Sequence, residues 1–101
     1  MMNISVKAID FSADSKLIAF IEKKLQRLTR YFDRDITAEV HLKLQNTGSS
    51  IKQKIAEVHI QVPGGWLIDK KSDTTFESAI DASTETLKRQ LIRHKEKMIK
   101  R

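Results

Sequence analysis

The chain has 101 residues, the size of one domain, and can build one modest hydrophobic core rather than a large interior active site. It contains no cysteine, which excludes disulfides and thiolate metal sites, and it has no run of about 18 apolar residues with which to span a membrane. The formal net charge is +6, and a positive excess of this kind predicts a polyanionic partner.

The first two predicted elements are a strand and a helix. Ile4, Val6 and Ala8 alternate with polar residues in the period-two pattern of a half-buried strand, and no signal-peptide core precedes them, so we expect a cytoplasmic protein. Asp14 is suited to cap the N-terminus of a helix that runs to about Phe32. The apolar residues of this helix recur every three or four positions, as a buried face requires: Leu17, Ile18, Ile21, Leu25, Leu28 and Phe32.

The middle of the chain predicts three strands joined by short turns. Apolar residues alternate strictly with polar ones over 36–44 and again over 56–62, and a polar turn cluster at 46–50 separates the two segments. Residues 63–65, Pro-Gly-Gly, predict a tight reversal. A weaker strand is expected over 66–71.

A long helix is predicted at the end of the chain. Thr74 and Glu77 have the spacing of a capping box at its start. About 26 helical residues span roughly 40 Å, which exceeds the diameter of roughly 34 Å expected for a globule of this size. We therefore expect the basic C-terminal end to overhang the sheet. The predicted buried stripe is Phe76, Ile80, Ser83, Leu87, Leu91, His94 and Met98.

The order of elements is thus β-α-β-β-β-α, in a single domain over residues 1–101. Two amphipathic helices and a four-stranded mixed sheet predict an α+β two-layer sandwich with both helices on one face. The first connection should be a right-handed crossover that places the first two strands parallel, and the two hairpins should make the other pairs antiparallel.

The positive charge is concentrated in the helices. Residues 85–101 carry seven lysines or arginines against two acidic residues, whereas residues 1–84 carry twelve against eleven. Solvated helix faces usually intersperse both signs, so this concentration favours nucleic-acid binding through phosphates. The basic residues of the first helix fall on one face, away from its apolar stripe: Lys16, Lys23, Arg27, Arg30 and Arg34.

Catalytic and metal chemistry are not indicated. His41 and His59 project from the outer face of the sheet and His94 from the inner stripe of the last helix, without the spacing of a metal site. No phosphate-cradling glycine loop or nucleophile motif is present, so we expect no enzyme and no cofactor. Trp66 is expected to anchor the edge of the core. Without a paired aromatic platform on the sheet, we expect recognition of shape and phosphate rather than of bases.

Several motifs resemble the ribosome hibernation promoting factor and ribosome-associated inhibitor A family over essentially the whole chain. In chain order they are Glu22-Lys23-Lys24-Leu25, Leu28, Tyr31-Phe32-Asp33-Arg34, the Gly64-Gly65 hairpin, Ala79-Ile80-Asp81, Leu87-Lys88-Arg89-Gln90-Leu91, Arg93-His94-Lys95 and Lys97. The longest of these motifs, in the last helix, is also the most specific.

The resemblance implies binding to the rRNA of the small ribosomal subunit in the channel of messenger and transfer RNA, with inhibition of translation in resting or stressed cells. It also implies the short type of factor, without a C-terminal ribosome-dimerisation domain and with any pairing of ribosomes left to a separate factor. No small-molecule substrate is expected. The rRNA-contacting residues implied by the resemblance are Lys23, Lys24, Arg27, Lys88, Arg89, Arg93 and Lys95, and Arg30 joins them through its place on the basic face of the first helix.

Two other functions remain open. One is a free-standing double-stranded RNA-binding domain, although such domains begin with a helix and carry their lysines at the start of the last helix. Here the first element is a strand and the basic residues lie late in the last helix. The other is a protein-binding regulator of transcription, a role once attached to the family that the chain resembles.

Overall fold

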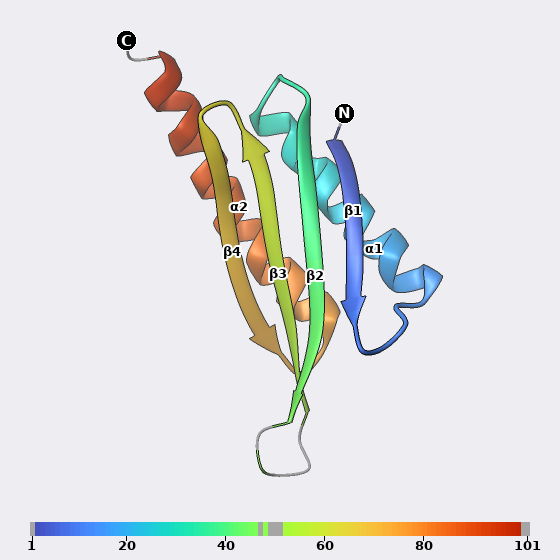
Figure 1. Ribbon diagram of the computed structural model, residues 1–101. Coiled ribbons are helices and arrows are strands. Elements are labelled where there is room, and N and C mark those ends of the chain that lie inside the picture. Colours follow the sequence, from blue (N-terminus) through green and yellow to red (C-terminus); the bar gives the residue numbers. More distant parts are fainter. Residues whose placement is uncertain (1, 47, 49–51, 100–101) are drawn as a thin grey trace.

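The computed structural model describes residues 2–46, 48 and 52–99. The order of elements is β-α-β-β-β-α, as predicted, with one short 3-10 helix after the first α-helix (Figure 1). The elements are β1 (Met2–Ile9), α1 (Ser15–Gln26), η1 (Arg27–Tyr31), β2 (Ile36–Asn46), β3 (Lys52–Val62), β4 (Gly65–Asp73) and α2 (Phe76–Ile99).

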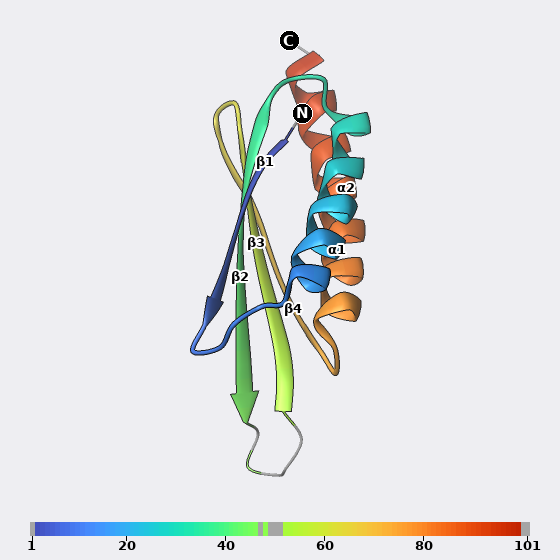
Figure 2. The same cartoon turned by 90° about the vertical axis from the view of Figure 1, so that its right-hand side faces the viewer.

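The four strands form one sheet in the order β1-β2-β3-β4. β1 and β2 are parallel, and the β2–β3 and β3–β4 pairs are antiparallel, so the predicted mixed sheet is confirmed. Figure 2 shows both helices against the same face of the sheet. No helix of the described residues covers the other face (Figure 2), which we call the open face.

The core lies between the sheet and the helices. Inward residues of β2 and β3 such as Val40, Val58 and Ile60 are fully buried, and they pack with Ile21 of α1 and Leu87 of α2. Full burial of an aliphatic side chain stabilises a fold by about 1.5–3 kcal/mol, so this central layer supplies most of the stability. Period-two and helical spacing predicted these positions correctly.

The first helix is shorter than predicted. Asp14 caps it as expected, because its Oδ1 accepts a hydrogen bond of 2.8 Å from the backbone N–H of Leu17. The α-helix ends at Gln26, however, and the chain continues as η1 instead of running helically to Phe32. The Thr29 hydroxyl donates to the Gln26 carbonyl at 2.7 Å, a local bond that competes with regular helical bonding.

The last helix begins one residue later than a Thr74–Glu77 capping box requires. Thr75 is the capping residue, and its Oγ1 accepts a hydrogen bond of 3.0 Å from the N–H of Ser78. This start buries Phe76, whose ring stacks on Phe11 with 5.3 Å between the centroids. Packing of Phe76 therefore accounts for the shift from Thr74 to Thr75.

The β3–β4 hairpin turns through Pro63 and Gly64, since Val62 pairs with Gly65. Gly64 has a φ of +92°, a conformation that glycine adopts without strain. The register places Trp66 opposite Gln61, on the open face, where 45% of Trp66 is exposed. The expectation that Trp66 anchors the edge of the core is therefore wrong.

The C-terminal turns of α2 extend past the β3–β4 turn, as the length of the helix predicted (Figure 1). Leu91 is the last fully buried residue of this helix, and His94 and Met98 are half-buried. No helix in residues 2–46, 48 and 52–99 has the length and apolarity needed to cross a membrane.

Candidate nucleic-acid interface

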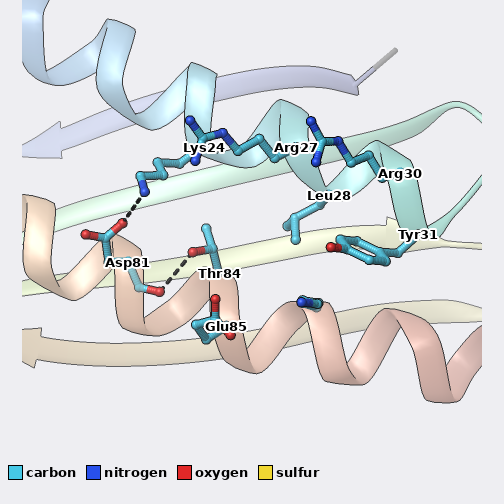
Figure 3. Close-up of a pocket in the computed structure, with 9 residues that line it drawn as sticks. Lys24, Arg27, Leu28, Arg30, Tyr31, Asp81, Thr84 and Glu85 are labelled. Carbon is cyan, nitrogen blue, oxygen red and sulfur yellow. Dashed lines mark hydrogen bonds and ion pairs between the residues drawn. The ribbon is translucent and has the colours of Figure 1, made fainter.

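A groove of about 400 Å³ runs between the first helical segment and α2 (Figure 3). It collects side chains from α1, η1 and α2 that are far apart in the sequence. We call it the interhelix groove, and it is lined by Lys24, Arg27, Leu28, Arg30, Tyr31, Asp81, Thr84, Glu85 and Lys88.

Four of the eight predicted RNA-contacting residues meet in the interhelix groove: Lys24, Arg27, Arg30 and Lys88. Arg27 and Arg30 line up because η1 has three residues per turn, which superimposes positions i and i+3. Lys88 comes from α2, and its Nζ lies 5.1 Å from the centre of the Tyr31 ring. The 3-10 segment, which the sequence pattern did not predict, thus aligns two of the cations.

Lys24 is already engaged in the free protein. Its Nζ lies 2.9 Å from Oδ1 of Asp81, and Figure 3 shows this ion pair crossing from α1 to α2. One helical turn after Asp81, the Thr84 hydroxyl donates a hydrogen bond of 2.9 Å to the backbone carbonyl of Asp81. Asp81 was not among the predicted site residues, and only the contact between helices reveals its role.

The groove retains a positive excess. Four cationic side chains face two carboxylates, those of Asp81 and Glu85. In the described part of the chain, Arg27, Arg30 and Lys88 form no ion pair. Their charges are available to an external anion, and a guanidinium can donate two parallel hydrogen bonds to one phosphate.

The other four predicted residues lie outside the interhelix groove. Lys23 and Arg89 are exposed, and Lys95 is half-buried on the side of α2 that carries Lys88. Arg93 lines a small hollow of about 140 Å³ near Leu67 of β4, on the other side of the buried stripe. Five residues separate Lys88 from Arg93, about 140° around an α-helix, so the two cannot share one face.

The open face carries a row of aromatic rings, of which the sequence predicted the two histidines but not Trp66. The rings of His41 and His59 stack with 5.6 Å between centroids, and Trp66 meets His59 edge-on at 6.4 Å. His59 Nε2 hydrogen-bonds to Oε2 of Glu57, which lowers the pKa of Glu57. No group of three potential metal ligands occurs among the described residues.

Comparison with known proteins decides the family. The model of the family described as sigma 54 modulation protein / S30EA ribosomal protein matches residues 4–99. The chain belongs to this family. The resemblance predicted from the motifs of the two helices is thereby confirmed, and the S30EA family match covers both walls of the interhelix groove.

Individual family members agree with this assignment. The ribosome hibernation promoting factor of Azotobacter vinelandii is 33% identical over 100 residues, which cover 99% of this chain and 89% of that protein. The ribosome hibernation promotion factor of Deinococcus radiodurans is 32% identical over 81 residues, 80% of this chain but 42% of that protein. The crystal structure of the Thermus thermophilus Protein Y N-terminal domain is similar with a TM-score of 0.82 and 30% identity, covering 92% of this chain and 99% of that one.

Proposed function

We propose that this protein binds the rRNA of the small ribosomal subunit in the channel used by messenger and transfer RNA, and that it thereby inhibits translation and promotes ribosome hibernation. Membership of the S30EA family and similarity to relatives named ribosome hibernation promoting factors support this proposal. The protein would act in the cytoplasm, where ribosomes translate. Its effect would come from occupancy of the channel rather than from catalysis.

The observation that carries the proposal is the convergence of unpaired cations in the interhelix groove. Arg27 and Arg30 line the wall formed by η1, Lys88 lines the wall formed by α2, and no described carboxylate forms an ion pair with them. Binding of a phosphate by each cation releases condensed counterions, which drives association with RNA. Because the walls belong to two packed helical segments, the backbones that carry these cations are held in a fixed arrangement before RNA arrives.

The remaining predicted residues would extend this contact. Lys23 and Arg89 are exposed beyond the groove, and Lys95 continues the side of α2 that carries Lys88. Arg93 would reach phosphates on the β4 side of α2. A surface that presents cations on both sides of one helix fits an RNA partner that surrounds the protein, as the wall of a channel does, better than it fits one short duplex.

Two triple variants of equal charge test the proposal. R27A/R30A/K88A removes the three unpaired cations, and K7A/K43A/K70A removes three exposed lysines of the strands. Binding to purified small subunits is measured over a range of salt concentrations. The first variant should flatten the slope of log affinity against log salt by about 2–3 units, because each phosphate contact contributes about 0.7–0.9. The second should change the slope by less than about one unit.

The same variants separate the proposal from its alternative. R27A/R30A/K88A should no longer inhibit a cell-free translation extract, whereas K7A/K43A/K70A should inhibit like the native protein. Equal losses in both variants would mean that only the total charge matters, and the groove would not be the binding site. Binding to free duplex RNA with the affinity shown for small subunits would favour the double-stranded RNA-binding function instead.

A further inference from the structure

A second hollow lies at the other end of α2, between its last turns and the β3–β4 turn. Its volume is about 540 Å³, larger than that of the interhelix groove, and it contains none of the eight predicted RNA-contacting residues. Its described lining has two cationic residues and no acidic one. The lining residues are Arg34, Pro63, Gly64, His94, Lys97 and Met98.

One of the polar groups that line this hollow is the imidazole of His94. Nε2 of His94 is buried, and among the described residues it has no hydrogen-bond partner. The ring lies near Phe32 of the core, with 6.0 Å between the centroids, which fixes the position of the imidazole. Folding therefore withdraws this nitrogen from water without giving it a protein partner, an arrangement that is costly unless a ligand supplies the missing bond.

The charges around His94 are predominantly positive. Lys97 lies three residues further along α2, and Arg34 reaches the hollow from the segment between η1 and β2. Arg93 lines the adjoining small hollow, which also includes His94. Glu96 follows His94 by two residues, about 200° around the helix, and so points away from it. Asp35 lines a separate hollow on the far side of Pro63.

We propose that this hollow is a second anion site, which binds a phosphate group. The Nε2–H of His94 donates a hydrogen bond to one phosphate oxygen, and Arg34 and Lys97 balance the charge on the others. Two cations at the same hollow disfavour a metal ion, although a histidine alone could ligate one. A phosphodiester of RNA and the phosphate of a free nucleotide share this chemistry, and where the phosphate belongs to rRNA the site rests on the proposed function.

The three histidines of the chain allow a direct test. The free protein, labelled with ¹⁵N, is titrated with inorganic phosphate and, separately, with a short single-stranded RNA that has no terminal phosphate. Sodium chloride at equal ionic strength is the reference. The ring resonances of His94 should shift in a saturable manner, while those of His41 and His59, on the open face, should not. A response to RNA alone identifies a diester as the ligand, and a response to inorganic phosphate alone identifies a free phosphate or nucleotide.

Variants of His94 separate hydrogen bonding from packing. H94F keeps an aromatic ring beside Phe32 but has no donor, and H94Q keeps an N–H donor of similar reach. Binding is followed through the backbone amides of Gly64 and Gly65, at the turn beside the hollow. H94F should lower the affinity about tenfold, the expected loss of a charge-assisted hydrogen bond, and H94Q should stay within about twofold of the native protein.

Three results would overturn the proposal: no response to either probe, a simultaneous shift of all three histidines, or native affinity in H94F. None of these bears on the interhelix groove, because the titrations use the free protein without ribosomes. Failure of R27A/R30A/K88A to weaken small-subunit binding would contradict the proposed function and leave the response of His94 to inorganic phosphate intact.

Discussion

Asp81 neutralises one of the four cations that line the interhelix groove. It pairs with Lys24 across the two helices at 2.9 Å, and the side chains are 28% exposed for Lys24 and 52% for Asp81. Pairs this accessible contribute only about 0–1 kcal/mol to stability. Under the proposed function, the main effect of Asp81 would therefore be to hold one cation away from phosphate, rather than to hold the fold together.

Replacing Asp81 with Asn should release Lys24 and strengthen RNA binding. One additional phosphate contact would steepen the slope of log affinity against log salt by about 0.7–0.9, with little change in melting temperature. E85Q is the matched control, since it also deletes one negative charge from the groove but frees no paired lysine. If E85Q steepened the slope of log affinity against log salt as much as D81N does, the release of Lys24 would not be the cause.

Glu57 and His59 on the open face should make folding stability depend on pH. The hydrogen bond from His59 is the largest cause that lowers the pKa of Glu57, and the charges of His59, Lys70 and His41 add to it against an opposing effect of burial. Because the pKa is lowered on folding, the stabilisation is complete above the ordinary pKa of glutamate. It is lost as the pH falls through the lowered value.

Melting temperatures of the native protein and of E57Q between about pH 7 and pH 3 would measure this effect, since glutamate ordinarily titrates near 4.3. The native protein should be the more stable near neutrality, and the difference should shrink towards pH 3. E39Q is the control, because Glu39 lies 3.8 Å from His41, outside hydrogen-bond distance. A difference between the native protein and E57Q that is constant with pH would contradict the linkage.

For single residues, the sequence predicted which residue types line the interhelix groove but not which of them form ion pairs with one another. Charge and the family resemblance predicted Arg27, Arg30 and Lys88 as RNA contacts, and the structure places all three in the interhelix groove. The sequence could not predict that Lys24 meets Asp81, because the two residues are 57 positions apart and their contact depends on how the two helices pack. Trp66 was misplaced for a similar reason: the register of one hairpin decides its face.

Among the elements, the β3–β4 hairpin depends on one backbone conformation. Gly64 has a φ of +92°, and no atom lies within 4 Å of the position that a Cβ would occupy. G64A should therefore test strain alone, without a clash, and should cost about 1–2 kcal/mol of unfolding free energy. Chemical denaturation would measure the loss. G64N should lose less, because asparagine tolerates positive φ, and equal losses would mean that the turn is not the cause.

Strands and caps differ in how far sequence alone predicts them. Strict alternation over β2 and β3 located both strands, because one face is buried and the other is not. The capping residue of α2 was displaced by one position, since stacking of Phe76 on Phe11 selects the start. The 3-10 winding of η1 accompanies a hydroxyl bond and packing against α2, neither of which appears in helical periodicity.

For the molecule as a whole, the last turns of α2 lie beyond the hydrophobic core, so folding should depend on them much less than binding would. Truncation after Lys95 removes the half-buried Met98 but retains Leu91, the last fully buried residue of α2. Calorimetry should show that cooperative melting persists with a loss of about 1 kcal/mol, the value for a partly buried methionine. Truncation after Gln90 removes Leu91 as well and should abolish or strongly weaken the transition. Loss of cooperative melting in the protein truncated after Lys95 would show that the terminal turns of α2 belong to the core.

The position of Trp66 has a consequence for optical measurements. It is the chain's single tryptophan, so all the indole fluorescence of the protein arises from one half-exposed ring beside His59 on the open face. An RNA whose phosphates bind only to the helices, on the side opposite the open face, would leave the wavelength of that emission unchanged. A ligand that covers the open face would remove water from the indole and move the emission to shorter wavelength. With an isolated RNA, which contains no indole, the native protein thus carries an intrinsic reporter that tells which of its two faces the ligand covers.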